Sequence, residues 1–168
     1  MSVVLQSFMD GIYDWIYYLY PDKIIIWNNQ DEPRPTTDYI LLGVVTPAVM
    51  DCSADKQYLT TDKVRYITYE SMTISVNVYS QTEHGQIMNK IIRSQYFDEV
   101  RLLLKKSGLA IRKSTNPVDL SALEDTAFTN RCQCDFIFSY VAKEEVKTPR
   151  ISRIAGDIDG IEFDVEQS

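Results

Sequence analysis

The sequence has little of what most catalytic and metal-binding sites are built from. Its 168 residues include one histidine, three cysteines and six glycines. One histidine leaves little scope for a Ser-His-Asp triad, and the scattered glycines form no Walker or dinucleotide-binding spacing. No apolar run approaches the roughly twenty residues that span a bilayer. We therefore expect a protein that is not an enzyme, has no cofactor or metal ion, and does not associate with a membrane.

Three features could still be mistaken for ligand sites. Cys132 and Cys134 alternate on a predicted strand with Phe136, so they are better explained as small buried hydrophobic residues. Residues 157–160 resemble part of a calcium loop, but the third oxygen ligand and the final glutamate are missing. His84 would need cysteines or carboxylates as its co-ligands. None of the three predicts a metal site.

The charge balance and the cysteine count limit the partners and the compartment. The net charge of −7 and the pI near 4.7 argue against a general affinity for nucleic acid. The odd number of cysteines follows no disulfide framework, and the first residues lack the pattern of a signal peptide. We expect free thiols in a reducing cytoplasm. The 11 tyrosines either border the sheet surface or lie where subunits meet.

Hydrophobic periodicity predicts helices and alternating strands. Helices are expected over residues 3–20 and 83–107, the second divided near Ser94 and capped by Gly108. Residues 46–62 and 114–126 are expected to be irregular, the latter with room for one helical turn. Strands are expected at these positions: 23–27, 38–45, 64–69, 72–79, 109–113 and 131–140.

This order of elements predicts an α+β fold, with a mainly antiparallel β-sheet and helices packed on one face. The strand at 72–79 places Met72, Ile74, Val76 and Val78 on the core face. Its other face, which carries Thr73, Ser75 and Asn77, is expected to meet water or a neighbouring chain. We expect one domain over residues 1–142 and an acidic C-terminal arm over 143–168. From residue 154 the arm carries five acidic residues and no basic one yet keeps several apolar residues, which indicates ordering only against a partner or against its own sheet edge.

A combination of features over residues 2–142 points to a known family. An amphipathic helix precedes the stretch Trp27-Asn28-Asn29-Gln30 … Pro33-Arg34-Pro35 … Tyr39-Ile40, which leads into an apolar strand. The alternating strand at 72–80, a long helical region and a late strand through Phe136 follow. Together they resemble the tail-terminator-like neck proteins of tailed bacteriophages, the phage neck terminator family. The acidic arm and the polar insert at 52–62 depart from the plainest members.

The resemblance implies a non-enzymatic subunit of a homo-hexameric ring. Such a ring caps the tail tube and joins it to head-completion proteins, with double-stranded DNA only as passing cargo. Its partners would be copies of itself, the tail tube or sheath protein, and a head-closure or adaptor neck protein. The location implied is the tail and neck of the virion, assembled in the cytoplasm of the bacterial host. The residues expected to contact neighbours are Trp27, Asn29, Pro33, Arg34, Pro35, Tyr39, Thr73, Ser75, Asn77, Tyr79, Ile158, Ile161 and Phe163.

Two alternatives remain open from the sequence. One is another component of the same machinery, such as a head-tail connector, a head-closure protein, or a tail or baseplate protein. The other is a small hydrolase, because 24 acidic residues always offer carboxylate pairs, although nothing singles out any pair.

Overall fold

The chain folds as a long sheet with helices on one side. The computed structural model describes residues 3–28, 34–50, 54–60, 63–124, 127–147, 153–158 and 161–166. The helices are α1 (Val3–Leu19), α2 (His84–Ser94) and α3 (Asp98–Lys106). The strands are β1 (Ile24–Trp27), β2 (Tyr39–Met50), β3 (Asp55–Thr60), β4 (Lys63–Tyr79), β5 (Leu109–Ser114), β6 (Val118–Asp119), β7 (Ala122–Glu124), β8 (Ala127–Thr129), β9 (Arg131–Lys147), β10 (Arg153–Ile158) and β11 (Ile161–Glu166).

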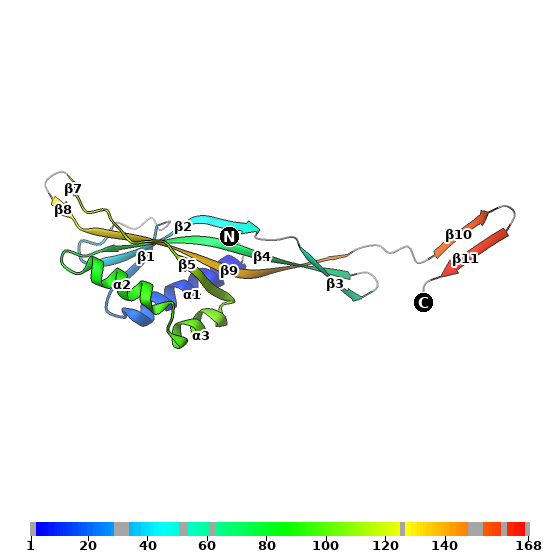
Figure 1. Ribbon diagram of the computed structural model, residues 1–168, viewed down its shortest axis with the longest axis horizontal. Helices are drawn as coiled ribbons and strands as arrows, with labels where there is room; N and C mark the ends of the chain where they lie inside the picture. The colour runs from blue at the N-terminus through cyan, green and yellow to red at the C-terminus, as the bar shows by residue number, and fades with distance from the viewer. Residues whose placement is uncertain are drawn as a thin grey trace.

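The main sheet has seven strands in the order β1-β2-β4-β9-β5, with β3 paired to β4 and β6 paired to β9. Only β1 and β2 run parallel among these pairs. All three helices lie on the same side of the sheet (Figure 1). The predicted α+β class, with a mainly antiparallel sheet and helices on one face, is confirmed.

The core lies between this sheet and the helices. Met72, Ile74, Val76 and Val78 are buried against it, as their alternation predicts. β9 supplies the matching row, buried on the same side: Cys132, Cys134, Phe136, Phe138 and Tyr140. Both cysteines there are free thiols, and burial raises the pKa of each. These thiols are packing residues of the sheet.

Helix boundaries follow the local sequence closely. The helical region divides into α2 and α3 between Ser94 and Asp98, which confirms the predicted break. Gly108 has φ of 77°, a left-handed conformation that glycine adopts without steric cost. Its amide donates to the Lys105 carbonyl across 3.0 Å and closes the last turn of α3. The predicted glycine cap is therefore confirmed.

The long central strand differs from the prediction. Residues 63–79 form one strand instead of two, although Glu70 and Ser71 interrupt the apolar alternation. Glu70 and Ser71 continue the strand because they pair with Tyr140 and Ser139 of β9, and the Tyr140 hydroxyl also donates to Glu70 Oε2 across 2.7 Å. The prediction that residues 46–62 are irregular is also wrong for the described part of this segment. β2 continues to Met50, and β3 pairs with the first half of β4.

Two further segments are more ordered than expected. In place of a loop or helical turn over 114–126, β6 pairs with β9, and β7 pairs with β8. β9 runs on to Lys147, past residue 142, because it follows β4 along its whole length. The Arg65 guanidinium lies 2.6 Å from the Glu145 carboxylate across this pair. Pairing with distant strands, not local pattern, orders these residues.

The C-terminal arm forms a hairpin of its own. β10 and β11 pair antiparallel, with Arg153 opposite Glu166 and Ile158 opposite Ile161. No described strand of the main sheet pairs with this hairpin, and ordering of the arm against a partner or its own sheet edge stays a prediction. Figure 1 shows the hairpin beyond the far end of β9, away from the helices.

Candidate interaction surfaces

The described part of the Pro-Arg-Pro stretch borders a polar hollow beside the end of the sheet. The hollow measures about 270 Å³. Residues 34–39 form one wall, and the ends of β4 and β8–β9 contribute Tyr79 to Gln81 and Asn130. Arg34 is exposed at this site and Tyr39 is buried. Trp27 is buried in the main core instead, while Asn29 and Pro33 lie outside the described residues.

Asp38 fixes the base of this loop. Its Oδ2 accepts a hydrogen bond from the Ser80 hydroxyl at 2.7 Å and from the Lys23 ammonium at 3.0 Å. The Ser80 hydrogen bond, followed by that of Lys23, lowers the pKa of the Asp38 carboxyl despite some burial. The loop is thereby held to β1 and to the end of β4 at neutral pH.

Two tyrosines and an arginine stack beside the hollow. The Tyr39 and Tyr79 rings are 4.4 Å apart at 9°, because the two residues are register partners on β2 and β4. The Arg131 guanidinium lies 5.5 Å from the centre of the Tyr79 ring. Burial raises the pKa of the Tyr39 phenol, so this hydroxyl is neutral at physiological pH. The stack is a rigid amphipathic surface of the kind that subunit interfaces favour.

The polar face of β4 is largely occupied from within the subunit. Asn77 accepts two hydrogen bonds from Arg131, at 2.7 and 3.1 Å, and donates to Ser75. Ser75 is 7% exposed and Asn77 is 5% exposed, whereas Thr73 is half-buried. Arg131 also donates to Gln133 at 3.1 Å. A neighbouring chain bound at this face would contact mainly the β9 residues of the hydrogen-bond network, Arg131 and Gln133.

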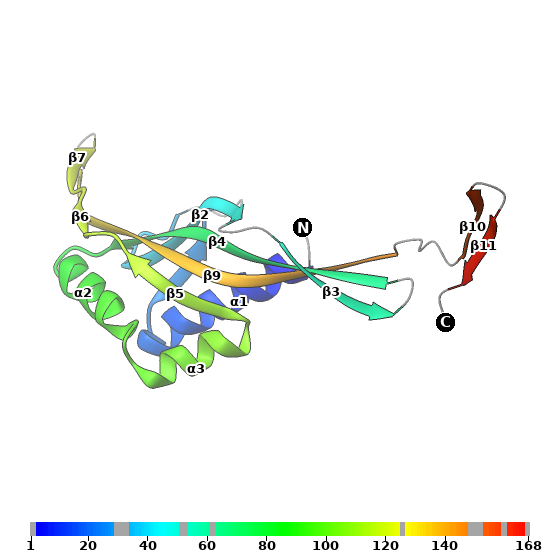
Figure 2. The same cartoon turned by 45° about the vertical axis from the view of Figure 1, so that its right-hand side comes forward.

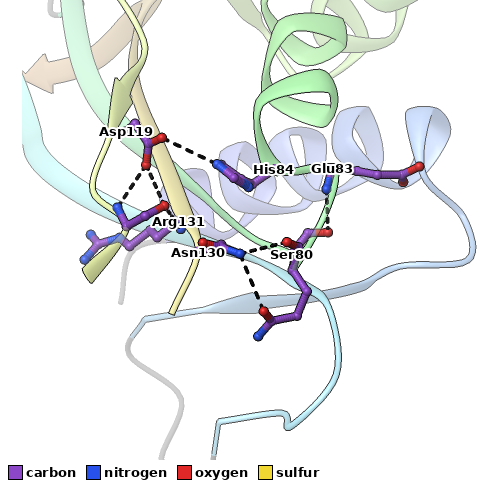
Figure 3. A network of polar contacts seen from close by, with 8 residues as sticks. Ser80, Glu83, His84, Asp119, Asn130 and Arg131 are labelled. Atoms are coloured by element: carbon purple, nitrogen blue, oxygen red, sulfur yellow. Dashed lines mark hydrogen bonds and ion pairs between the residues drawn. The ribbon is translucent and has the colours of Figure 1, made fainter. Parts of the chain in front are cut away.

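The turn between β4 and α2 is tied to the opposite strand. The Asn130 amide donates to the Gln81 carbonyl at 2.7 Å, and the Glu83 amide donates to the Ser80 hydroxyl at 3.3 Å (Figure 3). His84 Nε2 lies 3.6 Å from Asp119 Oδ2 on β6. These contacts position the hollow, and they give His84 a place in the packing of the turn.

The structure adds an aromatic surface that the sequence analysis did not single out. Tyr13, Tyr17 and Tyr18 are exposed on α1, and the rings of Tyr13 and Tyr17 stack at 6.1 Å. The sequence did contain evidence for this surface, because these tyrosines extend the apolar character of the helix onto its outer face. A helix that is apolar on most sides is typical of one that packs against a further partner.

The far end of the sheet forms a ribbon beyond the helices. There β4 pairs with β9 on one side and β3 on the other (Figure 2). Tyr58, Tyr69 and Val146 are exposed along it. Apolar side chains on an extended ribbon are again typical of a surface that meets other chains.

No ligand chemistry emerges from the described residues. Within the described ranges, no three histidine, cysteine, aspartate or glutamate side chains cluster as metal ligands would. The helices of that same part of the chain are all too short or too polar to cross a membrane.

One protein family, the phage neck terminator protein, matches residues 3–167. The chain belongs to the phage neck terminator family. This neck terminator is accordingly a structural protein of the tail and neck of the virion, and it interacts with other tail and neck proteins.

Other comparisons add little to this neck terminator's assignment. No curated protein matches the chain. One chain of solved structure is 16% identical to it, with a TM-score of 0.37 over 83% of this chain and 96% of the other.

Proposed function

We propose that the protein is one subunit of a homo-hexameric ring that closes the head-proximal end of the tail tube. The ring joins the tail to the head-completion proteins, and double-stranded DNA passes through its lumen. The observation that carries this proposal is the family match over residues 3–167, nearly the whole chain.

The fold supports ring formation because its two ends differ. A closed ring needs two unlike surfaces on each subunit that fit each other. The sheet ends in β1 on one side, next to the Arg34–Tyr39 hollow, and in β5 on the other. Neighbouring subunits therefore present dissimilar edges to one another.

The contacts with neighbours that the sequence predicts would fall on three surfaces. The hollow offers Arg34, Pro35, Tyr39 and Tyr79, and the polar face of β4 and β9 offers Thr73 together with the network around Ser75 and Asn77. The hairpin offers the positions Ile158, Ile161 and Phe163. Tail tube or sheath protein would lie on one side of the ring, and a head-closure or adaptor protein on the other.

The acidic balance suits a channel for DNA. A lumen wall that neutralised many phosphates would hold the duplex by counterion release and slow its passage. A chain with a net charge of −7 has few cations to spare for such contacts.

Reconstruction of the virion by electron cryomicroscopy tests the proposal. We expect sixfold density for this chain at the neck, between the last tube ring and the head-completion proteins, with no strongly basic inner wall. Absence of the chain from purified virions, or its position in the baseplate or capsid, would overturn the proposal.

A further inference from the structure

The outer face of α1 combines tyrosine rings with carboxylates. Tyr13 and Tyr17 are exposed there, and so are Asp10 and Asp14. Residues three and four apart on a helix are neighbours on its surface, so these four side chains form one continuous patch, the α1 surface. α1 contains no basic residue, and no described cation of the subunit forms an ion pair with either aspartate. The α1 surface is therefore both aromatic and negative.

The two tyrosines lie on the side of α1 that faces away from α3. Gly11 faces the other way, because a Cβ atom added to it would meet Ser107, the residue that follows α3. Tyr13 and Tyr17 follow Gly11 by two and six residues, which places them about 200° and 240° around the helix from it. Their rings stack with centres 6.1 Å apart. The stack thus projects from a side of α1 that α3 of the same chain does not cover.

A positive surface lies on α3 and β5. Residues 101–113 contain five basic residues and no acidic one. The two acidic residues of α3, Asp98 and Glu99, are confined to its first turn. All five bases are exposed: Arg101, Lys105, Lys106, Arg112 and Lys113. In a chain of net charge −7, this is a distinct concentration of positive charge.

An exposed leucine gives this positive surface an apolar centre. Leu102 is 61% exposed. Lys105 and Lys106 follow it by three and four residues, so they are its neighbours on the outside of α3. We call Arg101, Leu102, Lys105 and Lys106 the α3 surface. Among the described residues, no carboxylate forms an ion pair with its three bases.

The two surfaces lie toward opposite ends of the sheet. β1 and β5 are the ends of the strand order. α1 contacts β1, and α3 contacts β5. A closed ring needs two unlike surfaces on each subunit that fit each other. An acidic and a basic surface attract each other in head-to-tail order, whereas two copies of the same surface repel.

The chemistry of the two surfaces also matches. Tyrosine supplies rigid apolar area that covers an exposed leucine, and its ring face attracts an ammonium or guanidinium group. The carboxylates supply the ion-pair partners that the bases lack within the described part of the subunit. Because every copy carries both surfaces, a second copy of the chain satisfies both at once.

We infer that the α1 surface of one subunit packs against the α3 surface of the next copy around the ring. The tyrosine rings lie on Leu102 and beside the lysine ammonium groups, and the two carboxylates pair with the same lysines. The inference rests on the proposed ring, because the ring places copies side by side, and it names the side chains that join them.

Disulfide trapping between two variants of the full chain tests this contact. One variant carries Tyr13→Cys, and the others carry a single cysteine at each of the four positions of the α3 surface in turn. All carry Cys52→Ser, so that the remaining native thiols are the buried pair on β9. The two chains are mixed at high concentration and are also supplied together to assembling tails, then oxidised.

We expect a disulfide-linked pair of unlike chains for at least one position of the α3 surface. Tyr58→Cys on β3 is the matched control for Leu102→Cys, because the two side chains are 62% and 61% exposed. It is expected to give no linked pair with Tyr13→Cys. A single chain that carries both trapped cysteines is expected to give a ladder of linked copies that extends beyond two.

Charge reversal provides the second arm. Asp10→Lys with Asp14→Lys in one chain, and Lys105→Glu with Lys106→Glu in another, are each supplied as the only copy to assembling tails. We expect the incorporation of each to fall on the order of tenfold, because like charges then meet at the contact. Mixing the two variants is expected to restore incorporation, since each contact in an alternating ring again joins opposite charges. This recovery also shows that both variants fold.

The outcomes separate this inference from the proposed function. Absence of the mixed disulfide at all four positions overturns the inference, as does a ladder that stops at two copies or normal incorporation of both charge variants. A sixfold ring in tails with any of these results leaves the proposed function standing. A mixed disulfide and a longer ladder in particles without a ring contradict the ring and retain the contact.

Discussion

The indole Nε1 of Trp15 donates a hydrogen bond to the Ser94 hydroxyl across 2.9 Å, linking α1 to the end of α2. Both side chains are fully buried. The Trp15 ring meets Phe136 edge-on at 5.1 Å, so the indole is fixed against β9 as well. The Ser94 hydroxyl donates in turn to the Ile91 carbonyl at 2.6 Å. One buried serine thus joins two helices over the sheet.

Ser94→Ala is expected to lower the free energy of unfolding by about 1–3 kcal/mol, because it leaves a buried indole N–H without its acceptor. Denaturant titration followed by tryptophan fluorescence measures the effect. Trp15→Phe combined with Ser94→Ala removes both partners, and we expect it to cost less than the sum of the single changes. A loss under 0.5 kcal/mol for the serine variant would show that the hydrogen bond is not significant.

Gly11 on α1 lies close to Ser107, the residue that follows α3. A Cβ atom there would lie 2.3 Å from the Ser107 Oγ and 2.5 Å from its Cβ. Gly11→Ala is therefore expected to destabilise the protein by about 1–3 kcal/mol through overpacking, although alanine favours helices. Gly85→Ala on α2 is the matched control, because nothing lies within 4 Å of its added Cβ.

Thermal unfolding of the two alanine variants should show opposite signs. We expect Gly85→Ala to be neutral or stabilising by up to about 1 kcal/mol. Adding Ser107→Gly to Gly11→Ala should recover most of the lost stability. A Gly11→Ala variant as stable as the original protein would mean that the two helices separate at little cost.

The Asp38 carboxylate is expected to stabilise the hollow in a pH-dependent way. Its pKa is lowered in the folded state by the Ser80 hydroxyl and the Lys23 ammonium. The stabilisation is therefore present above the ordinary aspartate pKa of about 4 and is lost as the pH falls through the lower folded value. Asp38→Asn is expected to cost about 1 kcal/mol at pH 7, since a third of the side chain is exposed and solvent screens the pair.

The difference in unfolding free energy between the original protein and Asp38→Asn should begin to shrink near pH 4 and disappear as the pH falls through the lower folded pKa of Asp38. The exposed neighbour Asp22 supplies the control, and we expect Asp22→Asn to leave the difference at pH 7 within 0.5 kcal/mol, as is usual for surface changes. A constant gap from pH 7 down to pH 3 would contradict the assignment to the ionised carboxylate.

Arg131 is expected to be irreplaceable by lysine. Its guanidinium reaches Asn77 with two nitrogens and Gln133 with one, a fork that an ammonium does not reproduce. Arg131→Lys is expected to cost about 1–2 kcal/mol, because the buried Asn77 Oδ1 loses the guanidinium donors that it accepts from. A double-mutant cycle with Asn77→Ala should give a coupling of at least 0.5 kcal/mol, and additive effects would show that the network is not cooperative.

Local pattern was enough to predict the elements that carry their own periodicity. The alternation of Met72, Ile74 and Val76 and the glycine at 108 determine local geometry, so the strand and the cap could be predicted. The continuity of β4 through Glu70 could not, because its partner, the Tyr140 hydroxyl, lies 70 positions later. β6 is likewise ordered by β9 and not by its own residues.

The candidate interaction surface could likewise be predicted only in part from the sequence. The hollow lies beside Arg34 and Pro35, two of the residues that the resemblance implied as contacts with neighbours. The opposite wall of the hollow brings Ser80 beside Asn130. These residues meet through pairing of distant segments, which no local pattern encodes. The Tyr39–Tyr79 stack has the same origin, because it follows from the register of two strands.

The pairing of β4 with β9 over all 17 of its residues determines when this protein can fold. Tyr79 meets Arg131, 52 positions later, and Lys63 meets Lys147, 84 positions later. Closing such long loops costs conformational entropy before the strand pairing can stabilise the chain. Chains dominated by distant contacts therefore fold slowly. During synthesis the centre of the sheet stays incomplete until β9 has left the ribosome, so in each subunit β4 exposes an unpaired hydrophobic edge until almost the whole chain is made.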